Sequence, residues 1–481
     1  MDVGIRKFEQ NSKPISRKAL LMRYKKSNLI ARRNKILPIR FIKQDMTTYS
    51  GLALIDHFLG LYKIHSRIKE TFKRYDFKGD YSIGDILFVL FVMIILGAER
   101  LHHLDYLRSD PLFCRVVRLT RIPHRTKIST ALKQFTSDSL RALVELNSEL
   151  VTEKLQSVGL IEITIDLDGT VISTKGNPTW AFKGYNPVRR GANSYFPLTA
   201  HIAETGHFLY IINRPGNVHD SNRALWLIKM IRKQLLQFSV RFRADSAFCA
   251  PKVINYLLKN KIPFAIKAPF WKILSLKETA QQRRKWFKID DAWSYFWTKE
   301  PIDSLDHEHY VFVLRKKLKE PRKNFQLNLF SPNNGIYEYS AVVTDSKEWK
   351  PKNLLLFISG RSGQENSISE LKDDFAFDYV PTNTYQANSA YMQVSQMAYN
   401  LSISMQHDMG LVQKRSSNPK VTRLYRSMKW KTFRFLILNR AGRIGWEHGT
   451  KVLFLTFNKA TKQLYDRITN ALTEREFKKA A

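Results

Sequence analysis

The stretch Ile161-Glu-Ile-Thr-Ile-Asp-Leu-Asp168 alternates strictly between apolar and polar side chains. Successive side chains of a β-strand point to opposite faces, so this alternation predicts a strand with one apolar face. The apolar face would carry Ile161, Ile163, Ile165 and Leu167, and the polar face Glu162, Thr164, Asp166 and Asp168. The sequence therefore predicts a strand that ends in a carboxylate directly before Gly169.

Segments with strand and helix patterns alternate after this strand, which is typical of an α/β fold. Strands are predicted at residues 197–204, 208–213, 240–245 and 263–267, and helices at 222–236 and Pro251–Lys259. Residues 272–350 are rich in charged and aromatic residues, and their alternating segments at 310–314 and Tyr337–Thr344 predict a β-rich insertion. Beyond it we predict a strand at 354–358 and long helices at 364–375 and 385–407.

The part before the first strand has few glycines and apolar residues at three-and-four spacing, which predicts a helical N-terminal domain. We expect this domain to bind DNA. Within it, residues 126–135 fit a DNA-reading helix and a plain packing helix equally well. The predicted organisation is a basic arm (1–47), the helical domain (48–156), the first part of an α/β core (157–271), the insertion (272–350), the second part of the core (351–410) and a basic helical C-terminal region (411–481).

Charge is the strongest global feature of the chain, because 79 Lys and Arg face 42 Asp and Glu and leave a net charge of +37 over 481 residues. Such a field attracts polyanions, so nucleic acid is the first partner to consider, although ribosome-bound proteins and heparin binders share this bias. Thirteen of these cations lie within the first 43 residues, in an arm that suits either phosphate contact or solubility.

The compartment expected from the sequence is the cytoplasm. Residues 86–98 form an apolar run of 13 residues, short of the roughly 20 that a membrane helix needs, and we predict a buried core helix there. The N-terminus is charged throughout and lacks the pattern of a secretory signal. Cys114 and Cys249 have no second Cys or His at zinc-ligand spacing, so we expect a reducing compartment and no structural zinc.

Three carboxylates are candidates for metal chemistry. Asp168 and Asp245 each end a predicted strand, and α/β sheets place their sites at the carboxyl ends of strands. Asp-Gly is also a common turn sequence, and Asp245 would equally cap a following helix. On a helix with about 100° per residue, Arg361, Glu365 and Lys372 share one face and Glu370 lies opposite, as in an ordinary surface salt-bridge ladder. In a basic protein, converging carboxylates suit Mg²⁺ ions that catalyse phosphoryl transfer.

Several motifs occur in an order and spacing that resemble the DDE transposases of bacterial insertion sequences, in the branch with a Tyr-Arg-Glu-Lys helix, group thirteen-eighty. The resemblance runs from about residue 86 to 477. The motifs are Leu96-Gly-Ala-Glu-Arg-Leu101, Ile165-Asp-Leu-Asp-Gly-Thr170, Gly184-Tyr-Asn-Pro187, Ser194-Tyr-Phe-Pro-Leu198, Arg214-Pro-Gly-Asn217, Arg243-Ala-Asp-Ser-Ala-Phe248, Arg361 with Glu365 and Lys372, and Ala398-Tyr-Asn-Leu401.

The resemblance implies an RNase H-like core interrupted by a β-rich insertion. It implies that Asp168, Asp245 and Glu365 bind two Mg²⁺ ions, for which Mn²⁺ substitutes, and that Arg361 and Lys372 hold phosphates. The implied activity is cleavage at the terminal inverted repeats of an insertion sequence and joining of the ends to target DNA. By the same likeness we expect a cytoplasmic, nucleoid-associated homodimer on double-stranded DNA.

The chain departs from the family pattern at Ile358, where the family has Tyr, and the basic arm precedes the resembling portion. Asp166 is an alternative to Asp168 as first ligand, since both lie on one face of the predicted strand.

Two further segments are candidates for DNA contact. Residues 183–191 bend through glycine and proline and carry Lys183, Tyr185, Arg189 and Arg190, which suit phosphate contact and base stacking, or an ordinary surface loop. Trp293 and Trp297 would stack on a displaced base or pack in a core. Three other functions remain open: an inactive or domesticated sequence-specific DNA-binding protein of the same fold, a structure-selective nuclease and an RNA-binding protein.

Overall fold

The computed structural model describes residues 39, 41, 44–269, 279, 280, 282–298, 305, 309–318, 336–415 and 423–480. Asp45–Ala481 form one compact unit, separate from Met1–Gln44. Most of the predicted basic arm lies outside the described residues, but its last two residues form strand β1 (Met46–Thr47). The described helices and strands all belong to the unit that begins at Asp45.

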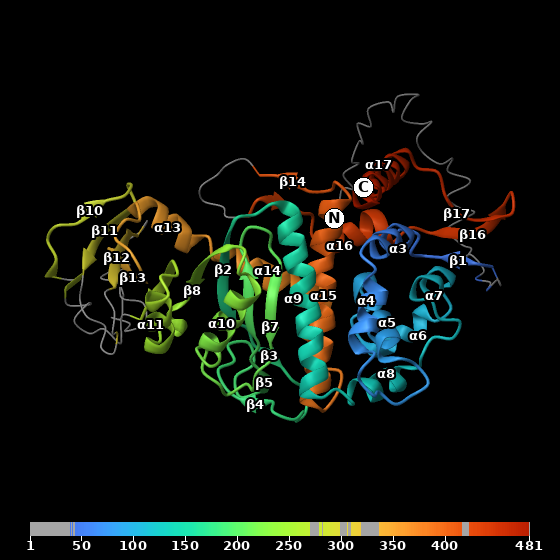
Figure 1. Cartoon of the computed structure of the whole chain (residues 1–481), viewed down its shortest axis with the longest axis horizontal. Coiled ribbons are helices and arrows are strands. Elements are labelled where there is room, and N and C mark those ends of the chain that lie inside the picture. The colour runs from blue at the N-terminus through green and yellow to red at the C-terminus, as the bar shows by residue number, and fades with distance from the viewer. Residues whose placement is uncertain are drawn as a thin grey trace, which may run out of the picture. The chain divides into compact units, whose positions relative to one another are not determined.

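The strand predicted from residues 161–168 is β2 (Glu162–Gly169), an interior strand of a mixed sheet (Figure 1). On one side β2 pairs antiparallel with β6 (Leu198–Ile202), which pairs with β7 (Phe208–Ile212). On the other side β2 pairs parallel with β8 (Ser239–Ala244), which pairs with β9 (Phe264–Ala268). The four strands predicted after β2 are thus confirmed.

The predicted alternation along β2 is confirmed with one exception. Ile163, Ile165 and Leu167 are buried in the core, but Ile161 precedes the strand and is 80% exposed. The first buried apolar residue of this face is therefore Ile163, not Ile161 as the sequence predicts.

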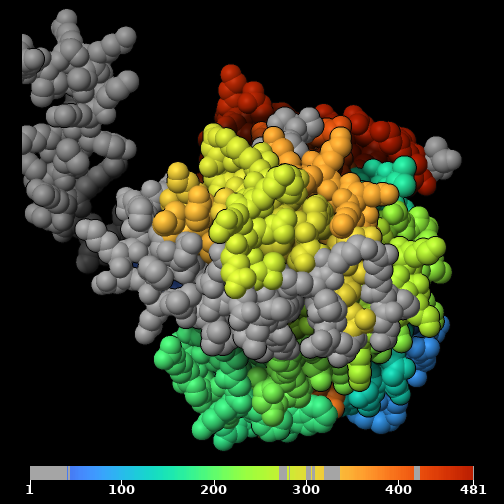
Figure 2. Space-filling view, turned by 90° about the vertical axis from the view of Figure 1, so that its left-hand side faces the viewer, coloured from blue at the N-terminus to red at the C-terminus, as the bar shows by residue number. Residues whose placement is uncertain are grey.

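The strands of the predicted insertion extend the same sheet. They are β10 (Phe287–Lys288), β11 (Trp293–Thr298), β12 (Tyr310–Lys317) and β13 (Tyr337–Thr344), and β13 pairs antiparallel with β9. The result is a nine-stranded sheet with the order β10-β11-β12-β13-β9-β8-β2-β6-β7. Figure 2 looks onto this end of the sheet, where the yellow residues of the insertion gather on the surface.

The strand predicted at residues 354–358 is wrong, because these residues lie in helix α13 (Pro351–Ser359). Proline is favoured in the first turn of a helix, and Pro351 stands there. Leu354 and Phe357, three residues apart, pack against Phe312 and Leu314 of β12. A short apolar run fits a strand and a buried helix equally well by pattern alone.

Helices cover both faces of the sheet (Figure 1). The apolar face of β2 packs against α9 (Ser137–Val158), α10 (Ala224–Gln234) and α11 (Pro251–Lys259). The polar face is covered by α14 (Ser362–Phe375), and α15 (Tyr385–Asp408) packs on β7 beside it. At the β7 edge α9 meets α15, where Asn147 Nδ2 donates to the Gln393 carbonyl at 3.0 Å.

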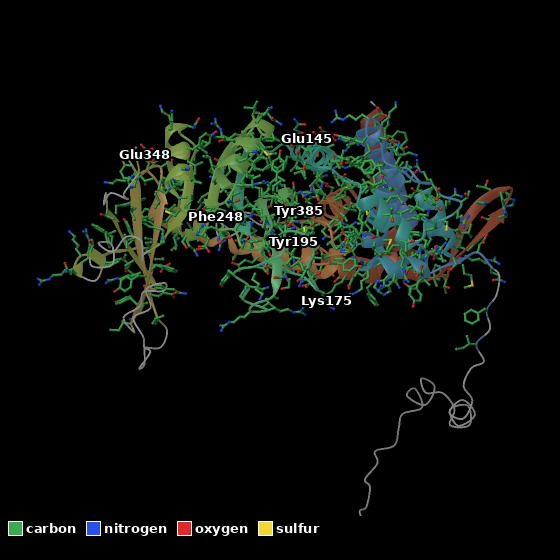
Figure 3. All side chains as sticks on the ribbon, turned by 90° about the horizontal axis from the view of Figure 1, so that it is seen from below. Glu145, Lys175, Tyr195, Phe248, Glu348 and Tyr385 are labelled. Carbon is green, nitrogen blue, oxygen red and sulfur yellow. The ribbon has the colours of Figure 1, made fainter. Side chains whose placement is uncertain are left out.

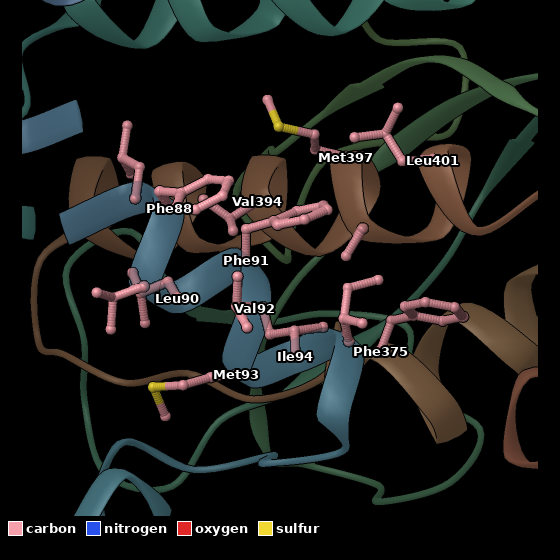
Figure 4. Packing of buried hydrophobic residues seen from close by; sticks show 14 of the residues in the cluster. Phe88, Leu90, Phe91, Val92, Met93, Ile94, Phe375, Val394, Met397 and Leu401 are labelled. Carbon is pink, nitrogen blue, oxygen red and sulfur yellow. The ribbon is translucent and has the colours of Figure 1, made fainter. Parts of the chain in front are cut away.

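The N-terminal part is helical, as predicted, from Leu52 to the end of α9 at Val158. Its helices are α3 (Leu52–Leu61), α4 (Ile64–Phe72), α5 (Ile83–Leu96), the short η1 (Leu101–His103) and α6 (Leu104–Leu107), α7 (Pro111–Val117) and α8 (Arg125–Leu132). Helix α5 holds the predicted core run, and Figure 4 shows Phe88 and Phe91 packed among residues of α15 such as Val394. Among the described residues, no helix is long and apolar enough to cross a membrane.

The C-terminal region is only partly helical, so that prediction is wrong in part. A hairpin of β16 (Gly442–Glu447) and β17 (Thr450–Leu455) pairs with β1, and a second short pair is β14 (Gln413–Lys414) with β15 (Tyr425–Arg426). The helical elements are α16 (Trp430–Phe433), the π-helical turn η3 (Arg434–Leu438) and α17 (Lys459–Ala480). The pairing of β16 with a strand some 400 residues earlier in the chain is a long-range contact that no local pattern encodes.

A small sheet, β3 (Ile172–Ser173), β5 (Asn193–Tyr195) and β4 (Phe182–Lys183), follows directly after β2. The short helix η2 (Ser246–Phe248) follows β8. Both lie at the carboxyl end of the two parallel strands that carry the predicted aspartates.

Candidate active site

The three predicted carboxylates converge on one guanidinium. Asp168 lies at the end of β2, Asp245 directly follows β8, and Glu365 is in the first turn of α14. Arg361 Nη1 is 3.3 Å from Asp168 Oδ2, and its Nη2 is 3.3 Å from Asp245 Oδ2 and 3.8 Å from Glu365 Oε1. Residues nearly 200 positions apart thus form one cluster, because β2 and β8 are parallel neighbours and α14 covers their carboxyl ends.

Asp168 is the most enclosed carboxylate of the cluster. Burial raises its pKa to about 6, opposed by the charge of Arg361 and reinforced by the charge of Asp245. Its Oδ1 accepts from the Gly169 amide at 2.9 Å. A Cβ at Gly169 would come within 2.5 Å of the Asp220 side chain, so the glycine is needed for close packing beside the carboxylate.

Asp245 combines the two roles that its sequence position suggests. Its Oδ1 accepts from the Ser246 amide at 2.8 Å and so caps η2, while Oδ2 faces Arg361. Lys267 of β9 lies 3.7 Å from Oδ1 and adds a second cation at this side of the cluster. The sequence prediction missed Lys267, whose place follows from the pairing of β9 with β8.

The helix that carries Glu365 begins at Ser362, with Arg361 at its N-cap. Glu370 points away from the cluster, as the helical-face argument predicts, and accepts from the Trp430 amide at 2.9 Å. Lys372 Nζ donates to the Val171 carbonyl at 3.0 Å, and burial lowers the pKa of this lysine. Lys372 therefore joins α14 to the segment that leaves β2.

Asp166 lies on the same strand face as Asp168 but has another partner. Its two oxygens accept from Arg243 Nε at 2.5 Å and Nη2 at 2.8 Å, in an ion pair that is almost wholly buried. Asp166 is thus held beneath the cluster, whereas Asp168 faces Arg361.

The cluster has the donor chemistry for Mg²⁺, since magnesium binds carboxylate oxygens. Arg361 is 9% exposed, and its Nη1 is buried without a hydrogen-bond partner among the described residues. A guanidinium held by three carboxylates marks the position where a positive charge is stabilised. Within the described part of the chain, no group of three or more His, Cys, Asp or Glu lies close enough to hold a metal as arranged here.

The sequence family agrees with this geometry. A family model described as transposase DDE domain group 1 matches residues 31–476. The chain belongs to this family. No curated protein matches it.

Two solved structures are similar to this transposase-family chain, with low sequence identity and low TM-scores. The cryo-EM structure of a piggyBac transposase synaptic complex with hairpin DNA has 12% identity and a TM-score of 0.43, over 90% of this chain and 84% of that one. The Mos1 transposase paired-end complex with the left transposon end has 10% identity and a TM-score of 0.17, over 35% and 57%.

A groove of about 320 Å³ opens beside the cluster of this transposase-family protein. Arg361 and Glu365 lie at its wall together with Trp293, Lys267, Lys316, Glu338 and Ile358. Ile358 stands where the resemblance expects Tyr. Trp293 lines the groove, whereas Trp297, the predicted DNA-contacting tryptophan, packs on Phe312 with ring centroids 4.8 Å apart and is not among its lining residues.

The predicted DNA-contacting loop of the transposase-family chain, residues 183–191, is exposed at the small sheet. Lys183, Arg189 and Arg190 are exposed, and Tyr185 is 79% exposed. Asn186 holds the bend, because its buried Oδ1 accepts from the Arg189 amide at 2.9 Å. The small sheet is joined to α15 through Tyr195 and Tyr385, which lie side by side in Figure 3 with centroids 5.7 Å apart.

The loop backbone is also fixed from below. A Cβ at Gly184 would lie 1.9 Å from the Gly216 carbonyl oxygen, so only glycine allows this approach. Trp180 and Phe182 add exposed aromatic surface next to the loop, and the sequence prediction missed both. Phe182 lies in β4, which pairs with β5 over only two residues, and so short a strand gives no pattern in the sequence.

Proposed function

We propose that this chain is the transposase of a bacterial insertion sequence, in the branch with the Tyr-Arg-Glu-Lys helix, and cleaves and joins DNA by metal-dependent phosphoryl transfer. The observation that carries the proposal is the convergence of Asp168, Asp245 and Glu365 on one cation in a member of a DDE transposase family. The strand order β7-β6-β2-β8-β9, with two antiparallel pairings on one side of β2 and two parallel pairings on the other, supports an RNase H-like core.

Asp168, Asp245 and Glu365 would hold two Mg²⁺ ions, or Mn²⁺ in their place. Two such ions supply the stabilisation of the attacking and leaving oxygens in phosphoryl transfer. The chain itself supplies the ligands on rigid elements, two at strand ends and one in the first turn of a helix. Asp166 is a poor first ligand in this proposal, since Arg243 occupies both of its oxygens.

DNA would lie across the cluster and the neighbouring cations. Arg361 and Lys372 would neutralise phosphates near the cleaved bond, and the loop with Lys183, Tyr185, Arg189 and Arg190 would hold the flanking backbone. The groove beside Glu365 suits a displaced base, with Trp293 as the stacking surface in preference to Trp297. We further propose that the protein acts in the cytoplasm on nucleoid DNA, as a homodimer that bridges the two inverted repeats.

The direct test is cleavage of the element's own ends. The terminal inverted repeats would be identified in the DNA that flanks the gene and offered to the purified full chain with Mg²⁺, Mn²⁺ or EDTA. We expect strand cleavage at the repeat ends and joining to target DNA only when a divalent metal is present. Specific binding without cleavage in every metal would instead establish the inactive DNA-binding protein of the same fold, to which Ile358 gives some support.

DNA binding is expected to weaken steeply with salt, because Lys and Arg displace counterions from phosphates. For about six phosphate contacts, raising salt from 50 to 200 mM lowers affinity roughly a thousandfold. The double variant Arg189→Ala/Arg190→Ala should reduce the slope of log affinity against log salt by about two. Arg232→Ala on α10 is the control, because Arg232 lies outside the loop and donates to Asn260 Oδ1 at 3.0 Å. Fluorescence anisotropy measures both, and a flat salt response would exclude the polyanion partner.

A further inference from the structure

A buried polar layer lies between the sheet and the helix that carries Glu365. In the antiparallel pairing of β2 with β6, Asp168 is opposite Thr199 and Asp166 is opposite His201. Directly opposed residues of antiparallel strands point to the same face, so all four side chains face α14. Thr199 and His201 are both buried, whereas the opposite face of these strands carries apolar side chains.

Gln364 of α14 enters this layer and is 0% exposed. Its Nε2 donates to the Asp166 carbonyl at 3.2 Å and to Thr199 Oγ1 at 3.0 Å. The orientation of the amide follows from its partners, because a backbone carbonyl only accepts. The hydroxyl of Thr199 in turn donates to the Asp168 carbonyl at 3.0 Å.

These bonds join the two chain segments that carry Asp168 and Glu365. One path of two hydrogen bonds runs from Gln364, the residue before Glu365, through Thr199 to the backbone of Asp168. A second tie lies one helical turn further along, where His201 Nε2 is 3.1 Å from Ser367 Oγ. At the other end Arg243 Nη1 donates to the Phe357 carbonyl at 2.5 Å, which fixes the helix before α14 to β8.

We propose that Gln364 and Thr199 are positioning residues that set the separation of the Asp168 and Glu365 carboxylates and thereby the affinity for divalent metal. The inference rests on the proposed metal-dependent function. Hydrogen bonds have a defined direction, so together with the packing they fix the register of the helix over the sheet. The register matters here because Glu365 reaches the cluster only from the first turn of α14.

The test compares two variants of one residue. Thr199→Val keeps the shape and branching of the side chain and removes the hydroxyl, whereas Thr199→Ser keeps the hydroxyl and loses a methyl group from the core. Mn²⁺ binding to the full chain without DNA is measured by electron paramagnetic resonance, and thermal stability by calorimetry. Loss of a group that orients a metal ligand lowers metal affinity by about 10–100-fold, so we expect at least a tenfold loss for Thr199→Val and close to none for Thr199→Ser.

A purely structural role predicts a different pattern, in which metal affinity follows thermal stability in both variants. Equal Mn²⁺ affinity in Thr199→Val and Thr199→Ser therefore overturns the inference. Gln364→Met is a second variant, which retains length and apolar contact but cannot donate, and it should match Thr199→Val. If the wild-type chain binds no Mn²⁺ while it is folded, the proposed metal-dependent function fails and the inference fails with it, whereas unequal variants support both.

Discussion

Asp245→Asn is expected to lower the rate of DNA cleavage by at least about a thousandfold while leaving the fold and DNA binding nearly unchanged. Asparagine retains the oxygen that accepts from the Ser246 amide, so η2 keeps its cap. The variant loses the negative charge that faces Arg361 and would bind metal. Metal ions stabilise the charge of the transition state by several kcal/mol. Each loss of about 1.4 kcal/mol of this stabilisation slows the reaction tenfold.

The matched control for this experiment is Asp345→Asn. Asp345 also accepts a backbone amide at a strand end of the same sheet, from Phe264 at 3.1 Å, but contacts none of the clustered carboxylates. Single-turnover cleavage of end DNA should be unchanged in the control, and both variants should bind DNA equally in EDTA. Wild-type cleavage by Asp245→Asn would remove this residue from the metal site.

Strand β2 could be predicted from the sequence because the pattern that defines it is local. One face of β2 is apolar and the other polar, and this alternation is visible in eight consecutive residues. The same holds for Asp245, which follows a strand and precedes a helical turn, and for Glu365, whose face relative to Arg361 and Glu370 follows from helical geometry. These are the residues that the structure brings together.

Features that depend on long-range pairing could not be predicted in this way. The hydroxyl of Thr199 reaches Asp168 only through the register of β2 with β6, and Lys267 reaches Asp245 only through the pairing of β9 with β8. The hairpin β16–β17 needs β1 as a partner. The direction of Arg361 was also not predictable, since it turns toward the carboxylates because three negative charges converge there.

Asp408→Ala is expected to lower the free energy of unfolding by about 3–5 kcal/mol, the range found when one partner of a buried ion pair is removed. The Asp408 side chain is fully buried, and Lys154 Nζ on α9, with a side chain only 4% exposed, donates to it at 2.6 Å. Arg475 of α17 is 2.7 Å from the same oxygen, and the Tyr62 hydroxyl donates to the other. Without Asp408, Lys154 is left buried beside a second cation.

The same cluster gives the variant a distinct pH dependence. Burial alone would raise the pKa of Asp408, but hydrogen bonds from His407 and Lys154 and the charge of Lys154 outweigh it and hold the pKa below its usual value. A depressed carboxyl pKa contributes stability that is present above the unfolded pKa of about 4 and is lost as pH falls through the folded pKa. Asp408→Ala should therefore lose most stability at neutral pH and differ least from wild type in acid.

Urea denaturation across pH measures this difference, and Asp466→Ala is its matched control. Asp466 pairs with Lys462 at 2.6 Å on the same C-terminal helix, but both side chains are more than half exposed, and such surface pairs contribute about 0–1 kcal/mol. If both variants lower the free energy of unfolding by the same small amount, the pair of Asp408 with Arg475 does not hold α17 to α15. A large effect confined to Asp408→Ala would show that the buried cluster joining α9, α15 and α17 stabilises the fold beside the β7 edge of the sheet that carries Asp168.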